Sequence, residues 1–106
     1  MTFIEQPQQP ANTASYYFIG IGGMGMAPLA MYLRGSGATV YGSDDAMAEH
    51  VRILLERYGV QLVPEIPDSV EEVIYSSAIE PAHPGYQQAV ARGLRLTRRG
   101  SFLARM

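Results

Sequence analysis

The sequence predicts a single α/β domain built on a five-stranded, mainly parallel sheet. Short apolar runs rich in aromatic and β-branched residues alternate with amphipathic segments of about 10 residues, the pattern of strands joined by crossover helices. The chain has 106 residues, of which 47% are hydrophobic. A chain of this length buries enough apolar surface for one hydrophobic core but not for a second lobe. We therefore expect three layers, with helices on both faces of the sheet.

The first 15 residues differ in composition from the rest of the chain. They are rich in Gln, Pro, Asn, Thr and Ser, and such a segment cannot bury enough apolar area to offset the entropy lost when it is ordered. We expect a flexible polar tail over residues 1–15 and a folded domain over residues 16–106.

The first strand is expected over residues 16–19, where an aromatic and β-branched run stops at Gly20. The first helix follows from Met26 to Leu33, because its apolar residues recur at helical spacing before a glycine-containing stop. A second apolar run over residues 38–41 then predicts the second strand.

The second half of the chain repeats this alternation. An amphipathic segment that ends before Gly59 is typical of a surface helix. The apolar runs after it are short and bounded by Pro or Gly. We expect a helix over 47–58, strands over 60–63 and 72–76, a helix over 84–92, a strand over 94–97, and over 101–106 the start of a helix, or a linker, capped by Ser101.

The composition excludes several chemistries. All eight basic residues are arginine, so the chain has no lysine for a Walker A phosphate loop or for a Schiff base. The chain also has no cysteine, which excludes disulfides, thiolate metal sites and thiol nucleophiles and fits a reducing compartment. The two histidines are not accompanied by a converging set of acidic residues, so we expect no metal site.

Charge and hydropathy bound the partners. A formal net charge of −2 argues against broad nucleic-acid binding. No apolar run approaches the roughly 20 residues that a membrane helix needs, and the N-terminus lacks a secretory signal, so we expect a cytoplasmic protein. Five arginines cluster without acidic residues, which indicates either a solvated or domain-facing surface or contact with an anion. They are Arg92, Arg95, Arg98, Arg99 and Arg105.

A glycine-rich loop separates the first strand from the first helix. Gly20, Gly22 and Gly25 match the G-x-G-x-x-G pattern, which permits a tight turn, close approach of a diphosphate and close packing of the helix. The helix N-terminus offers unpaired N–H groups to the anion. Asp44, at the end of the second strand, lies where a carboxylate accepts hydrogen bonds from ribose hydroxyls. The pattern predicts a Rossmann-like nucleotide site, for which NAD is the default ligand.

Four motifs follow one another along the chain. They are Gly20-Ile21-Gly22-Gly23-Met24-Gly25-Met26, Gly42-Ser43-Asp44, Ser76-Ser77-Ala78-Ile79 and Arg98-Arg99-Gly100-Ser101-Phe102-Leu103-Ala104. In this order they resemble the N-terminal domain of the Mur ligases, and the resemblance covers nearly all of residues 16–106. Within that family they look most like the branch that joins L-alanine to UDP-N-acetylmuramate, and next most like the branch that recycles murein peptides.

The resemblance implies that the domain binds UDP-N-acetylmuramate. The glycine loop would supply backbone donors to the diphosphate, the end of the second strand would lie at the uridine, and the loop after the fourth strand would close the other side. Either Arg98 or Arg99 would face the diphosphate or the muramyl carboxylate, or else solvent. The implied binding residues are Gly20, Gly22, Gly23, Met24, Gly25, Met26, Ser43, Asp44, Ser76, Ser77, Ala78 and Arg99.

The family's reaction, as the resemblance implies it, uses ATP and magnesium to activate the muramyl carboxylate for attack by L-alanine. We expect neither cofactor in this domain, because the phosphate loop would belong to a central domain followed by a C-terminal one. The chain is then an excised N-terminal domain or a natural stand-alone homologue. One departure concerns Pro64-Glu65, where family members often have Gly-His, which leaves a substrate contact from that loop open.

Two other functions remain open from the sequence. The glycine motif also fits a NAD-binding regulatory or dehydrogenase domain. The small size also fits a stand-alone module that senses a UDP-sugar.

Overall fold

The computed structural model describes residues 13–106, and most of the predicted tail lies outside these residues. The sheet has five strands in the order β3-β2-β1-β4-β5, and every pair is parallel. In chain order the elements are β1 (Ser15–Ile19), α1 (Met26–Gly35), β2 (Thr39–Ser43), α2 (Glu49–Arg57), β3 (Gln61–Leu62), β4 (Glu72–Tyr75), α3 (Pro84–Ala91), β5 (Arg95–Arg98) and α4 (Arg99–Arg105).

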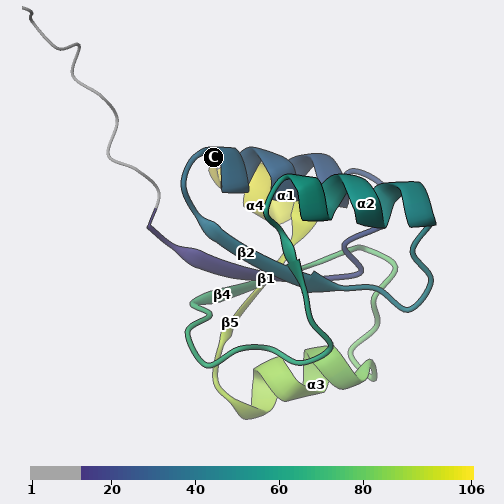
Figure 1. The fold of residues 1–106 in the computed structure, drawn as a ribbon. Coiled ribbons are helices and arrows are strands. Elements are labelled where there is room, and N and C mark those ends of the chain that lie inside the picture. The colour runs from purple at the N-terminus through teal and green to yellow at the C-terminus, as the bar shows by residue number, and fades with distance from the viewer. Residues whose placement is uncertain (1–12) are drawn as a thin grey trace, which may run out of the picture.

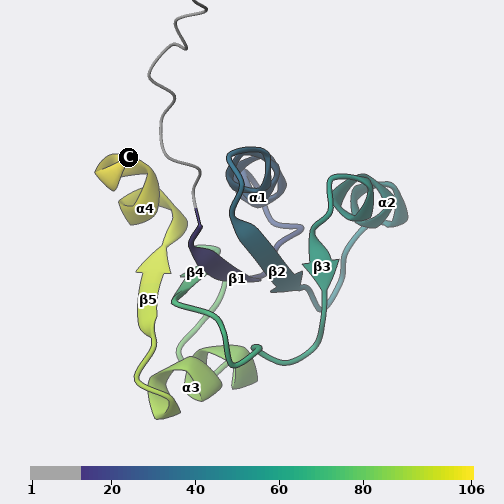
Figure 2. The same cartoon turned by 60° about the vertical axis from the view of Figure 1, so that its left-hand side comes forward.

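Helices cover both faces of this sheet. Figures 1 and 2 show α1, α2 and α4 above it and α3 below it. The predicted class, a Rossmann-like three-layer domain with a parallel sheet, is confirmed. None of the helices in residues 13–106 is long and apolar enough to cross a membrane.

The central strand β1 is buried from both sides. Phe18 belongs to the core cluster under α1 and α4, whereas Tyr17 and Ile19 belong to the cluster on the α3 face. All three are at most 1% exposed. Because both faces are covered, the strand is a continuous apolar run rather than an alternating one.

Several boundaries differ from those that the sequence predicts. β1 begins at Ser15, one residue into the predicted tail, because Ser15 pairs with Thr39 of β2. β3 has two residues instead of four, since it lies at the sheet edge and pairs only with Tyr41 and Gly42.

The C-terminal helix corrects a further prediction. α4 begins at Arg99, and its N-cap is Arg98 without a side-chain hydrogen bond. Ser101 is therefore inside the helix and does not cap it. Phe102 is 4% exposed and packs edge-to-face on Tyr16, with ring centroids 5.7 Å apart. Tertiary packing of this ring holds the segment as a helix from its first residue.

The strand register brings the predicted motifs to one edge. Ile19 at the end of β1 pairs with Ser43 of β2 on one side and with Tyr75 of β4 on the other. Tyr75 in turn pairs with Arg98 of β5. The segments after β1, β2, β4 and β5 therefore begin side by side, at the point where the strand order reverses and ligands bind in such sheets.

Candidate functional site

The glycine loop is held close to its neighbours by positions that lack a side chain. Gly20 has φ of +77° and donates its N–H to Ser43 O at 2.9 Å. Gly25, with φ of +74°, is the N-cap of α1. A Cβ on Gly25 would lie 3.0 Å from the Arg99 guanidinium carbon. Both positions need the left-handed conformation that glycine adopts without strain.

Asp44 is bound to this loop. One carboxylate oxygen accepts the Gly22 N–H at 2.7 Å and the other accepts the Ala46 N–H at 2.8 Å. The Gly23 N–H is also paired, with Gly20 O at 2.9 Å. The N–H groups of Gly22 and Gly23, two of the predicted binding residues, are therefore already engaged in this structure.

The open donors of the loop are Met24 and Gly25. Within residues 13–106 neither N–H makes a hydrogen bond. They lie just before α1, where the helix dipole is positive. The Met24 side chain is 94% exposed. This end of the loop can bind an anion through backbone N–H groups.

Arg99 is the cation at these open donors. Its side chain is half-buried against Gly25, and it forms no ion pair or hydrogen bond with any described residue. Arg98 is exposed. Others of the clustered arginines are engaged elsewhere: Arg92 donates to the carbonyl oxygens of Ile66 and Pro67, and Arg95 and Arg105 lie against Glu72.

The loop after β4 lies on the other side of the glycines. Ser76 is 8% exposed, and its hydroxyl accepts the Ala78 N–H at 3.1 Å. The same oxygen would lie 3.1 Å from a Cβ on Gly23. Ser76 therefore packs against the loop, whereas Ser77 and Ala78 are exposed beside it.

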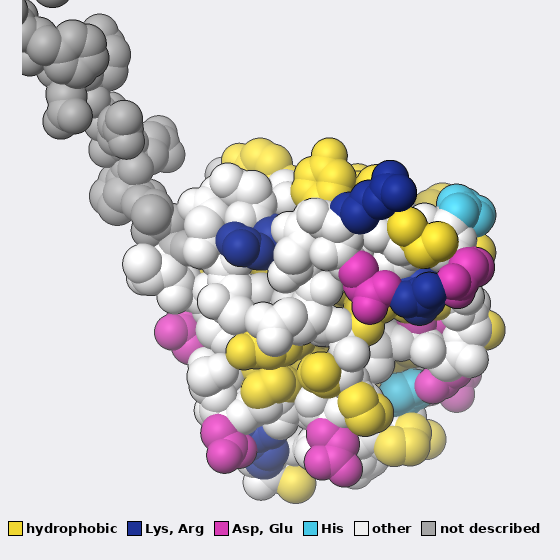
Figure 3. Space-filling model, in the orientation of Figure 1, with side chains coloured by type: hydrophobic (Ala, Val, Ile, Leu, Met, Phe, Trp, Pro, Cys, Tyr) yellow, Lys and Arg dark blue, Asp and Glu magenta, His cyan; other side chains and the backbone are white. Residues whose placement is uncertain are grey.

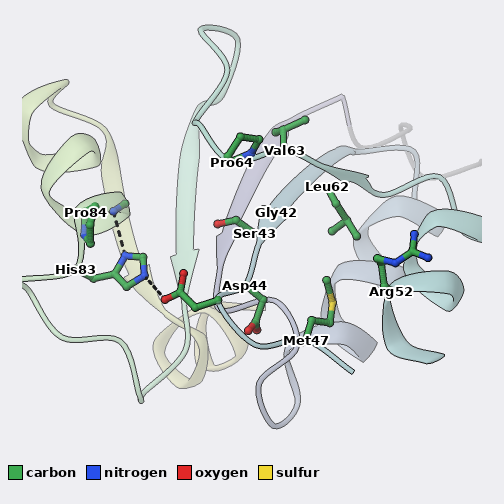
Figure 4. Close-up of a pocket in the computed structure, with 12 residues that line it drawn as sticks. Gly42, Ser43, Asp44, Met47, Arg52, Leu62, Val63, Pro64, His83 and Pro84 are labelled. Atoms are coloured by element: carbon green, nitrogen blue, oxygen red, sulfur yellow. Dashed lines mark hydrogen bonds and ion pairs between the residues drawn. The ribbon is translucent and has the colours of Figure 1, made fainter. Parts of the chain in front are cut away.

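Two pockets adjoin along this edge. The smaller, of about 250 Å³, is lined by the glycine loop and the loop after β4, including Gly22, Gly23 and Ala78. The larger, of about 520 Å³, lies at the ends of β2 and β3 (Figure 4). Both pockets share Ser43, Asp44, Asp45 and His83. The lining that belongs to the larger pocket alone is mostly apolar and includes Met47, Leu62, Val63, Pro64 and Pro84.

His83 has a structural role and lies at the site. Its Nδ1 accepts the Gly85 N–H at 3.0 Å and so caps α3. Because Nδ1 is an acceptor there, Nε2 carries the proton and donates to an Asp45 carboxylate oxygen at 3.1 Å. Figure 4 draws this hydrogen bond as a dashed line from the labelled His83. Among the described residues no group of three or more metal-ligating side chains converges.

Comparison with known proteins identifies the family. The family model described as "Mur ligase family, catalytic domain" matches residues 15–106. The chain belongs to the Mur ligase family. The resemblance predicted from the four motifs is thus confirmed.

Relatives in the Mur ligase family include enzymes of both branches. A UDP-N-acetylmuramate–L-alanine ligase from a Jannaschia species is 39% identical over 101 residues, which cover 92% of this chain and 21% of that protein. The UDP-N-acetylmuramate-alanine ligase structure from Thermotoga maritima matches with a TM-score of 0.72 and 27% identity, covering 84% of this chain and 21% of that one. The structure of a murein peptide ligase from Psychrobacter arcticus matches with a TM-score of 0.70 and 26% identity, covering 79% of this chain and 18% of that one. The chain therefore spans about a fifth of the length of these relatives.

Part of this candidate site is not predicted by any sequence motif. Met47 and residues 62–64 line the larger pocket and belong to none of the four motifs. The departure from the family pattern at Pro64 is the sequence signal that points there, because Pro64 follows the end of β3 and lines the pocket. The contact of His83 with Asp45 depends on the start of α3 lying next to the segment after β2. The spacing of residues in the sequence does not reveal such a tertiary contact.

The larger pocket has more acidic than basic side chains in its lining. Arg52 lines this pocket but forms ion pairs with Glu49 and Glu56. These carboxylates raise the pKa of Arg52 above its ordinary value, and Arg52 lowers the pKa of Glu49. On the face in Figure 3, basic side chains are scattered, some beside acidic ones and others apart from them. With Asp44 and Asp45 added, the larger pocket is suited to neutral groups that donate hydrogen bonds rather than to a phosphate.

Proposed function

We propose that this domain binds UDP-N-acetylmuramate and serves as the substrate-binding part of a ligase that joins L-alanine to that sugar nucleotide in peptidoglycan synthesis. The observation that carries the proposal is that two backbone N–H groups of the glycine loop, those of Met24 and Gly25, and the neighbouring Arg99 guanidinium all lack a partner within residues 13–106. A separate pocket at the ends of β2 and β3 is lined by apolar side chains and carboxylates. The names of the Mur ligase relatives support the choice of sugar nucleotide and amino acid.

The diphosphate occupies the end of the loop nearest Arg99. Met24 and Gly25 offer N–H groups there, and Arg99 adds a guanidinium that forms charge-assisted hydrogen bonds with phosphate oxygens. The N-terminus of α1 adds its positive dipole. The Gly22 amide contributes instead by fixing Asp44.

The uridine occupies the larger pocket. Uracil is a neutral ring that fits between apolar walls, and its N–H and the ribose hydroxyls can donate to Ser43 and to the Asp44 carboxylate. A phosphate on the 2′-oxygen of the ribose would meet the same carboxylate and be repelled. Ser77 and Ala78 lie exposed on the opposite side of the glycine loop.

We place ATP and magnesium outside this domain. A phosphate loop of the ligase type needs a lysine, and the chain contains none. Within residues 13–106 no carboxylate and histidine cluster of three or more converges that would hold a metal ion. We therefore assign ATP, magnesium and amide-bond formation to other domains of a longer cytoplasmic ligase, with this domain as the holder of the sugar nucleotide.

Titration calorimetry with UDP, UDP-N-acetylmuramate and NAD tests the proposal. We expect both uridine nucleotides to bind and NAD to give no heat. The Arg99→Gln variant should bind UDP about 10- to 100-fold more weakly, because it loses hydrogen bonds between charged groups. Arg98→Gln is the matched control, since Arg98 is adjacent but exposed, and should bind within about twofold of the unaltered chain. Binding of NAD without binding of UDP would instead assign the chain to the dinucleotide-binding class.

A further inference from the structure

The contact between His83 and Asp45 joins two segments on opposite sides of the candidate site. Asp45 follows β2, and His83 lies in the connection from β4 to α3. In the sheet β2 and β4 are separated by β1, whose end carries the glycine loop. The hydrogen bond from His83 Nε2 to Asp45, 3.1 Å long between residues 38 positions apart, therefore crosses the crevice in which β1 ends.

This contact stands at the boundary of the two pockets. Asp45 and His83 line both the smaller pocket over the glycine loop and the larger pocket at β2 and β3. A nucleotide whose diphosphate lies on the loop and whose base fills the larger pocket has to pass this boundary. We propose that the His83–Asp45 contact is a clasp, closed in the free domain, that opens when a nucleoside diphosphate spans both pockets. The inference rests on the proposed function.

The two arms of the clasp differ in how firmly they are held. His83 is 21% exposed, and the Gly85 N–H fixes its ring. The Asp45 side chain is 85% exposed and has no other partner among the described residues. The neighbouring Asp44, by contrast, is fixed by two backbone N–H groups. The Asp45 arm is thus the part that moves, while His83 stays on α3.

A single exposed hydrogen bond is weak enough for a ligand to displace. Such a contact adds little net stability because water competes for both partners. The free domain nevertheless has to break it before a spanning ligand binds, so the closed clasp lowers apparent affinity. Removing the clasp should therefore tighten the binding of a spanning ligand and leave a ligand of one pocket unaffected.

Binding of UDP and of inorganic pyrophosphate to the 106-residue chain, measured by calorimetry, tests the clasp. Asp45→Ala removes the mobile arm. His83→Asn removes the other arm and keeps the cap, because asparagine is a strong N-cap residue and does not reach Asp45. We expect each variant to bind UDP about 2- to 10-fold more tightly than the unaltered chain, the gain that one hydrogen bond represents. The double variant should gain no more than either single one, because both remove the same contact.

Pyrophosphate separates the clasp from a simple charge effect. It fills only the glycine-loop end, so both variants should bind it as the unaltered chain does. If Asp45→Ala tightens pyrophosphate and UDP equally, the lost negative charge explains the gain and the clasp is refuted. If the unaltered chain binds UDP and neither variant binds it more tightly, the clasp is refuted and the proposed function stands. If no form binds UDP, both proposals fail.

Discussion

Gly42 shows how little room the sheet leaves at one residue. It is buried in β2, and a Cβ there would lie 2.5 Å from Ile21 Cδ1 and 3.2 Å from Phe18 O. Replacing it with alanine should lower the free energy of unfolding by about 1–3 kcal/mol, because Ile21 has to leave its place in the core. Urea denaturation followed by circular dichroism measures this change.

Gly35 is the matched control for Gly42. A Cβ on Gly35 meets no atom within 4 Å, and Gly35 lies in the last turn of α1 with an ordinary φ. Gly35→Ala should raise the free energy of unfolding by about 0.5–1 kcal/mol, since alanine loses less backbone entropy on folding. Equal effects at the two glycines would contradict the crowding at Gly42.

At the residue scale, the sequence predicts positions better than contacts. It places Asp44 at the end of β2 beside the glycine loop, and the structure has it there. It does not predict that the carboxylate turns to the Gly22 N–H, because a spacing motif carries no information on rotamers. The crowding at Gly42 is hidden for a similar reason, since it depends on where Ile21 packs.

Tyr17 links β1 to a segment that does not pair with it. Its hydroxyl donates to Val63 O at 2.8 Å, beyond the end of β3, and so holds one wall of the larger pocket. Burial raises the pKa of Tyr17 above 10, and Glu65 adds to this shift. An unfolded tyrosine ionises near pH 10. The unfolded chain therefore loses this proton first, and the stability that Tyr17 contributes is lost as pH rises through and above about 10.

The Tyr17→Phe variant tests this element-scale link. It lacks the hydrogen bond to Val63 and should unfold with about 1 kcal/mol less free energy at pH 8. Between about pH 9.5 and 11 its stability should fall less steeply than that of the unaltered chain, because phenylalanine does not ionise. Parallel curves from urea titrations across this range would show that Tyr17 is not the group responsible.

At the element scale, the sequence predicts strands and helices well and their ends less well. The central β1 and the helix α1 are identified because apolar spacing and glycine stops agree. The length of β3 is overestimated, because an apolar run does not show that only two of its residues pair with a neighbouring strand. α4 is placed too late, because its first turn is polar and depends on the packing of Phe102 rather than on a cap.

At the scale of the whole molecule, α4 closes the domain. Phe102 packs on Tyr16 within the core cluster that also contains residues of α1 and β2. At the other end of the helix, Arg105 donates to the buried Glu72 carboxylate, which also accepts a 2.5 Å hydrogen bond from Thr97. The same helix begins with Arg99 at the glycine loop. The segment that the sequence left open as a linker is thus part of both the core and the site.

The Phe102→Ala variant measures that contribution directly. Because the ring is 4% exposed within the core, its removal should lower the free energy of unfolding by about 3 kcal/mol. Leu103→Ala, one residue later on the exposed side of the same helix and 42% exposed, should change it by no more than about 0.5 kcal/mol. Urea unfolding should be followed by both circular dichroism and tyrosine fluorescence. The two signals should change in a single coincident transition for each variant, because Phe102 belongs to the same core cluster as buried residues of α1, β1 and β2. An unchanged free energy of unfolding in Phe102→Ala would mean that α4 does not contribute to the core. Arg99 would then lack a fixed position at the glycine loop.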